Sequence, residues 1–114
     1  MDIEVTTLDP STNCLRLEGR LDAVNVDRIE IRLNAAAVAP GHDLLVDLSA
    51  VEFMASMGIR MLITAARSLR AKGARMVLFG AQPLVHEVLE HVAIDQIIPV
   101  AADQAQARAL LAAG

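Results

Sequence analysis

The feature of this sequence that most constrains its fold is a repeated change of hydrophobic period. Residues 3–8 and 13–18 alternate as half-buried strands do, and apolar residues then fall at helical spacing from Asp22. A short apolar run follows at 44–48, and helical and strand periods alternate twice more before the chain ends. Strand-helix-strand units of this kind form parallel sheets, and a hairpin at the start adds an antiparallel pair.

The predicted order of elements is strand-strand-helix-strand-helix-strand-helix-strand-helix. The later elements are helices at 56–72, 83–92 and 104–112 and strands at 75–79 and 97–100. This order predicts an α/β fold: a mixed sheet of four to five strands, with about four helices packed mainly on one side. Since no repeat, linker or low-complexity tract interrupts the pattern, we expect one domain spanning residues 1–114.

The composition excludes several classes of protein. With 54% hydrophobic residues the chain can bury an ordinary core, so it is not a disordered protein. A net charge of −4 and an aromatic content of 2% argue against nucleic acid as a partner, because surfaces that bind it are basic and stack bases. No signal peptide is visible and no apolar run approaches the ~20 residues of a membrane span, so we expect a cytoplasmic protein without direct membrane insertion.

Motifs that carry chemistry are scarce. Cys14 is the only cysteine and lies in an apolar strand pattern, which indicates a small core residue and excludes a disulfide or a cysteine-rich zinc site. The three histidines do not form a ligand set, and no glycine-rich phosphate loop or nucleophile-elbow motif occurs. We therefore expect no catalytic residue, no metal and no cofactor, and we predict a binding module and not an enzyme.

The informative segment is 47–58, where a buried strand ends, a short loop follows, and Ser56 stands at the start of a helix. Free N–H groups and the dipole at a helix N-terminus favour an anion. Ser56 is therefore either an ordinary N-cap or a phosphoacceptor, and the two roles are compatible.

Three methionines, Met54, Met57 and Met61, lie in or next to the same segment. They either complete the core or form an adaptable apolar patch for a protein partner. We expect Met57 and Met61 to be at least partly exposed and to form such a patch with Met54, near the loop that holds Asp22.

These segments resemble the STAS family, which is named for sulphate transporters and anti-sigma-factor antagonists. Residues 19–22, Gly-Arg-Leu-Asp, resemble the family's Gly-x-Leu-Asp loop, and residues 46–49, Val-Asp-Leu-Ser, resemble its central strand. Residues 55–58, Ala-Ser-Met-Gly, lie where the family commonly has Asp-Ser-Ser-Gly or Asp-Ser-Thr-Gly. The resemblance covers nearly the whole chain and implies a single STAS domain.

The resemblance also implies a function. In antagonists of this family, the first serine of the motif is phosphorylated by a kinase that is also an anti-sigma factor. The unphosphorylated protein binds that kinase, a histidine-kinase-like ATPase, and frees the sigma factor. By position the acceptor is Ser56, and the predicted partner-binding residues surround it: Asp22, Asn25, Met54, Ala55, Met57, Gly58, Arg60 and Met61.

Two residues depart from the family pattern. Ala55 stands in place of the motif's aspartate and Met57 in place of its second hydroxyl residue, so a charge is lost and a thioether is added. An apolar patch suits a permanent interface. The alternative function is therefore a constitutive STAS subunit of an ABC-type transporter or of a signalling scaffold, without phosphorylation. The sequence leaves the oligomeric state open.

Overall fold

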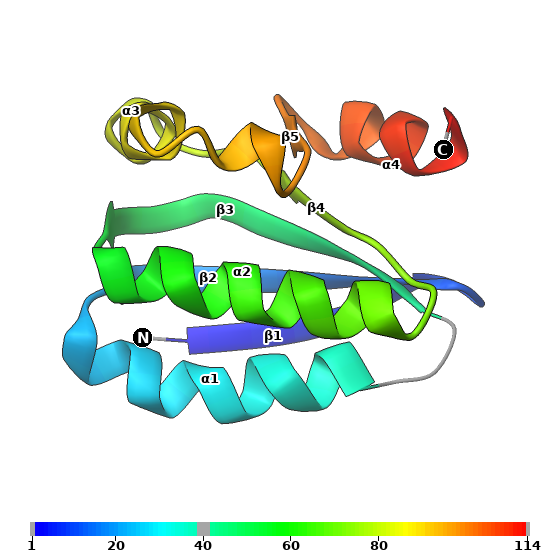
Figure 1. Ribbon diagram of the computed structural model, residues 1–114, viewed down its shortest axis with the longest axis horizontal. Coiled ribbons are helices and arrows are strands. Elements are labelled where there is room, and N and C mark those ends of the chain that lie inside the picture. The colour runs from blue at the N-terminus through cyan, green and yellow to red at the C-terminus, as the bar shows by residue number, and fades with distance from the viewer. Residues whose placement is uncertain (1, 39–41, 114) are drawn as a thin grey trace.

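A computed structural model of the chain describes residues 2–38 and 42–113 (Figure 1). The strands are β1 (Asp2–Asp9), β2 (Thr12–Leu21), β3 (Asp43–Met54), β4 (Met76–Phe79) and β5 (Val100–Ala101). The helices are α1 (Ala23–Val38), α2 (Ser56–Ala71), α3 (Pro83–His91) and α4 (Gln104–Ala113), and a 3-10 turn η1 (Ile94–Gln96) precedes β5. The predicted alternation of strands and helices is confirmed.

The five strands form one mixed sheet in the order β1-β2-β3-β4-β5. β1 and β2 are antiparallel, and β2 to β5 run parallel to one another, as the hairpin and the strand-helix-strand units predicted. The last strand is shorter than the predicted 97–100. The N–H groups of Ile97 and Ile98 donate at 2.8 Å to the Ile94 carbonyl and close η1, so these residues are not available to a sheet ladder.

The central strand β3 is longer than predicted, since the expected loop after residue 48 continues the strand to Met54. β2 is also longer and runs beside it, so that Leu21 pairs with Met54. The register shifts between Gly19 and Arg20, and Gly19 has φ of 109°, a conformation that glycine adopts without strain. The two strands therefore end together, at the point where α1 and α2 begin.

Apolar residues fill both faces of the sheet. The larger cluster joins alternate residues of β2, β3 and β4 to α1, α2 and α3, and Figure 1 shows α1 and α2 side by side along the sheet. The smaller cluster lies under α4 and includes Cys14, Val77 and Ala107. Three of the four helices thus pack against one side, as expected.

Cys14 is buried in the smaller cluster, as its strand pattern predicted. Desolvation, with a further contribution from the Asp47 carboxylate, raises the pKa of its thiol from 9.0 to about 11. The thiol is therefore protonated and unreactive near neutral pH, as expected for a core residue.

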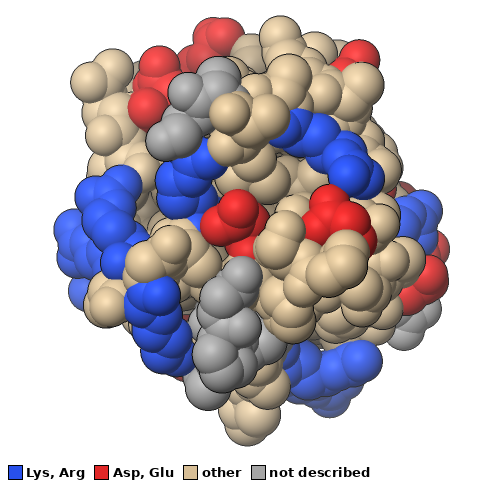
Figure 2. Space-filling view, turned by 90° about the vertical axis from the view of Figure 1, so that its right-hand side faces the viewer, with Lys and Arg blue, Asp and Glu red and all other residues tan. Residues whose placement is uncertain are grey.

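The end of the molecule farthest from the start of α2 carries charges of both signs. Figure 2 shows lysine and arginine interspersed with aspartate and glutamate over this face. One such pair is Arg108 with Asp9, whose Nη2 and Oδ2 atoms lie 2.9 Å apart. The described residues of this face therefore form no extended field of one sign of the kind that attracts nucleic acid.

Candidate functional site

The corner where β2 and β3 end brings together the two segments that carried the resemblance. The N–H of Ala55 donates to the carbonyl oxygen of Leu21 at 2.9 Å, directly after the pair formed by Leu21 and Met54. The loop at residues 19–22 therefore lies against the start of α2. Two motifs that are more than 30 residues apart in the sequence form one surface.

Ser56 is the first residue of α2 and is exposed, which confirms its predicted place at the helix start. It is not the N-cap. That position belongs to Ala55, with φ of −90° and ψ of 167°, and its methyl group makes no capping hydrogen bond. No side chain caps the helix, although the Gly58 N–H donates to the Ala55 carbonyl at 3.0 Å. The N–H groups before Gly58 are the ones that an anion beside the Ser56 hydroxyl can meet.

The side chains of Asp22 and Asn25 organise the neighbouring loop. Asp22 Oδ1 accepts a hydrogen bond of 3.0 Å from the Asn25 N–H and so caps α1, while its Oδ2 lies 3.9 Å from Arg20 Nε. Asn25 Nδ2 donates to the Arg20 carbonyl at 2.9 Å. These contacts hold in place the loop that is hydrogen-bonded to the start of α2.

Two arginines supply positive charge near the corner. The Arg20 guanidinium lies 4.4 Å from the centroid of the Phe53 ring, a cation–π contact between the two strand ends. Arg60 is exposed and four residues beyond Ser56. Helical side chains at i and i+4 share a face and lean toward the N-terminus, so Arg60 leans toward the serine.

The predicted methionine patch is wrong for two of its three members. Met57 is 44% exposed, as expected, but Met61 is 2% exposed and Met54 is 4% exposed. The reason is that α2 packs against α1 as well as against the sheet, so its buried face is wider than one apolar stripe. Met61 belongs to this face with Ile59 and Leu62.

Gly58, a predicted partner contact, is also buried. A Cβ atom placed on it would lie 2.9 Å from the Met54 sulfur and 3.0 Å from the Leu21 Cβ, so these neighbours would have to shift to admit it. Gly58 therefore lets α2 begin tightly against the ends of β2 and β3. The site residues that remain on the surface are the half-buried Asp22, Asn25 and Ala55 and the exposed Ser56, Met57 and Arg60.

Sequence analysis missed a groove of about 800 Å³ beside Ser56, between the end of β3 and α3. Three large apolar side chains line it and are exposed: Phe53 (40%), Leu84 (73%) and Val92 (46%). The available signal was the spacing of Leu84, Val88 and Val92, a second apolar stripe beside the buried Val85 and Leu89.

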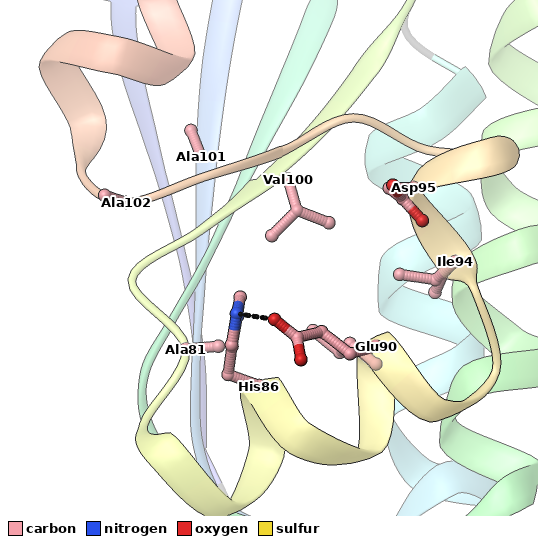
Figure 3. Close-up of a pocket in the computed structure, with 9 residues that line it drawn as sticks. Ala81, His86, Glu90, Ile94, Asp95, Val100, Ala101 and Ala102 are labelled. Atoms are coloured by element: carbon pink, nitrogen blue, oxygen red, sulfur yellow. Dashed lines mark ion pairs between the residues drawn. The ribbon is translucent and has the colours of Figure 1, made fainter.

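A second cavity of about 620 Å³ lies on the other side of α3, against η1 and β5 (Figure 3). His86 Nε2 and Glu90 Oε1 are 2.7 Å apart within it, so the two polar side chains engage each other. Among the residues that the structure describes, no group of three or more His, Cys, Asp or Glu side chains is placed to hold a metal ion. None of the helices in the described ranges has both the length and the apolar character needed to cross a membrane.

Comparison with known proteins places this arrangement among characterised folds. The model of the STAS domain matches residues 3–107. The chain is 27% identical over 100 residues to the anti-sigma-B factor antagonist of Listeria monocytogenes, and the match covers 88% of each chain.

Solved structures agree with this match. A STAS domain protein from Planctomyces limnophilus, described as an anti-sigma-factor antagonist, superposes with a TM-score of 0.82 at 25% identity, over 98% of this chain and 97% of that one. The anti-sigma factor antagonist SpoIIAA in its unphosphorylated form superposes with a TM-score of 0.79 at 20% identity, over 99% and 98%.

Proposed function

This chain belongs to the STAS domain family, and from that premise we propose that it acts as an anti-sigma-factor antagonist in the cytoplasm. In this role it is a regulatory protein-binding module and not an enzyme. The similarity to the Listeria antagonist over 88% of both chains supports the proposal. The observation that carries it is Ser56, exposed at the start of α2, where no side chain caps the helix and the preceding Ala55 N–H donates to the Leu21 carbonyl.

The proposed partner is a histidine-kinase-like ATPase that is also an anti-sigma factor. The unphosphorylated chain binds it through the surface around Ser56, and phosphorylation of Ser56 ends the interaction. A phosphate adds about −1.5 to −2 charges at neutral pH. At the positive end of α2, on the face that Arg60 shares, the fold tolerates this charge.

A phosphate on Ser56 weakens binding to the partner more than it affects the fold, for a physical reason. The side chain next to the acceptor is Met57, which is 44% exposed and offers an apolar contact. A hydrated dianion at Ser56 would have to be desolvated for that contact to form, which is costly unless the partner supplies matching charge. Phosphorylation therefore changes binding and leaves folding intact. SpoIIAA has solved structures in unphosphorylated and phosphorylated forms, so the same fold persists in that protein.

A second candidate function is a constitutive subunit of a transporter or scaffold. The observation that favours it is the pair of apolar residues, Ala55 and Met57, on either side of Ser56. Two apolar neighbours suit a permanent contact, and in this case Ser56 is never modified.

The experiment that separates the two functions starts from the purified chain and the histidine-kinase-like ATPase encoded nearest to its gene. After incubation with ATP, mass spectrometry maps the phosphorylated residue. We expect modification at Ser56, its loss in Ser56→Ala, and its retention in Ser11→Ala, which removes an exposed serine at the opposite end of the sheet.

Binding to the same ATPase completes the test. Ser56→Asp and Met57→Asp should weaken binding, whereas Ser11→Ala should bind like the parent protein. If Ser56 stays unmodified and Ser56→Asp binds as the parent does, the switch is excluded and the constitutive subunit takes its place.

A further inference from the structure

The groove between β3 and α3 has no role in the proposed phosphorylation switch, but it lies next to Ser56. We propose that this groove is the docking site for an amphipathic helix of the partner that carries lysine or arginine beside its apolar residues. The inference rests on the proposed function in one respect, namely that the chain acts by binding a protein. It adds a contact that extends from Ser56, which lines the groove, to α3, and it assigns the chemistry of that contact.

The first argument is the concentration of exposed apolar surface. Phe53 at the end of β3 and Leu84 and Val92 at the two ends of α3 converge on one groove, which Ala55 and Ile59 also line. Single exposed apolar side chains are normal on a protein surface, but a contiguous group marks an interaction site. The start of α2 lines the same groove through Ser56, so the apolar surface is continuous with the corner described above.

The second argument is shape. Leu84 and Val88 on α3 and Val92 at its C-cap lie four residues apart and line the groove. At 1.5 Å per residue this row is about 12 Å long, the length of roughly two helical turns. A partner helix lying along it can place apolar side chains at i and i+4 against the row, which is the usual way a helix occupies a groove.

The third argument is charge. Glu52 and Glu87 line the groove, and among the described residues that line it none is lysine or arginine. Carboxylates at the edge of an apolar groove complement lysine or arginine on the occupant and repel an acidic segment.

The test uses a probe peptide and the intact chain. The probe is a helical peptide of about 12 residues with leucines at i, i+4 and i+8 and lysines flanking them, compared with the same peptide carrying glutamates in place of lysines. Amide chemical shifts are followed during titration. We expect changes at Phe53, Leu84, Val88 and Val92, and binding of the lysine peptide at least about tenfold tighter than the glutamate peptide at low salt.

A matched pair of variants tests the apolar contact. Leu84→Asp places a charge in the groove, and Ile31→Asp places the same charge on α1, at an apolar side chain exposed to the same degree, 74% against 73%. We expect Leu84→Asp to weaken binding of the lysine peptide by about tenfold or more, and we expect Ile31→Asp to bind this peptide like the parent protein. A charge reversal at an exposed position, Glu87→Lys, should shift preference toward the glutamate peptide, and thermal melting confirms that all three variants fold.

The peptide experiments overturn the inference if both peptides bind equally, if the shift changes centre outside the groove, or if Leu84→Asp and Ile31→Asp have equal effects. Concentration-dependent self-association that Leu84→Asp abolishes also overturns it, since the occupant would then be a second copy. Binding to the ATPase separates the two proposals. If the groove inference alone fails, Leu84→Asp binds that ATPase like the parent while Ser56→Asp does not. If no variant or parent binds it, the proposed function fails, whatever the peptides show.

Discussion

Helices α2 and α3 each follow a parallel strand of the same sheet, but they are attached to it very differently. Over its 16 residues α2 buries a broad face: Gly58, Ile59, Met61, Leu62, Ala65 and Leu69. Over its nine residues α3 buries Val85 and Leu89, and it leaves Leu84 largely exposed. One helix buries residues along its whole length, whereas the other buries Val85 and Leu89 and packs Val88 only partly against the core.

The difference separates two tasks. A helix anchored in the larger cluster holds its first turn in a fixed position, which suits a residue that a kinase must recognise. A helix that buries only part of its apolar surface in the core leaves the rest exposed for contact with a partner. In this protein the proposed switch at Ser56 and the proposed docking groove therefore lie next to each other on different helices.

The largest effect should come from breaking the anchor of α2. Met61→Ala removes a side chain that is 2% exposed, and we expect a loss of about 2–5 kcal/mol of unfolding free energy. Met57→Ala, four residues earlier and 44% exposed, should change it by no more than about 0.5 kcal/mol. Urea denaturation of both variants measures the contrast, and similar losses would show that Met57 is part of the core.

A smaller loss should follow from crowding the start of α2. Gly58→Ala forces a methyl group against Leu21 and Met54, and overpacking of this kind costs about 1–3 kcal/mol. Alanine recovers up to about 1 kcal/mol through its better helix propensity, so we expect a net destabilisation. Thr64→Ala, at an exposed position of the same helix, is the control. A Gly58→Ala variant as stable as the parent would mean that α2 can shift away from the strand ends.

Substitution of Ala55, the residue before Ser56, should increase the stability of the protein. Ala55 is the N-cap of α2 and makes no side-chain hydrogen bond, so Ala55→Asp should add a cap and stabilise the protein by about 1 kcal/mol. Ala55→Asn supplies the same cap without charge and separates capping from the helix dipole. A lower midpoint in urea for both variants would show that the loop at residues 19–22 does not admit a larger side chain at this position.

The smallest effect on folding should come from α3. Leu84→Ser removes an apolar side chain that is 73% exposed, so we expect the unfolding free energy to stay within about 0.5 kcal/mol of the parent value. The difference in unfolding free energy between Leu84→Ser and Met61→Ala therefore measures how differently the two helices are attached to the core. A loss comparable to that of Met61→Ala would mean that Leu84 supports the core and is not free to bind a partner.

Much of the fold follows from local patterns in the sequence. The change of period at each element predicted the mixed sheet and all four helices, and it placed Ser56 at the start of α2. The helical spacing that starts at Asp22 also matches α1, whose first turn the Asp22 carboxylate caps by accepting the Asn25 N–H. These features are readable because a helix start or an alternating strand is specified by a few neighbouring residues.

Other features were decided by contacts between elements distant in the sequence. The extension of β3 to Met54 depends on pairing with β2, and the burial of Met61 depends on α1 lying beside α2. The groove exists because α3 stands beside the end of β3 while Leu84 and Val92 face away from the core. Hydrophobic period reports that a side chain is apolar and which face of its own element it occupies. Whether another element covers that face depends on where the rest of the chain packs, and only the tertiary structure decides it.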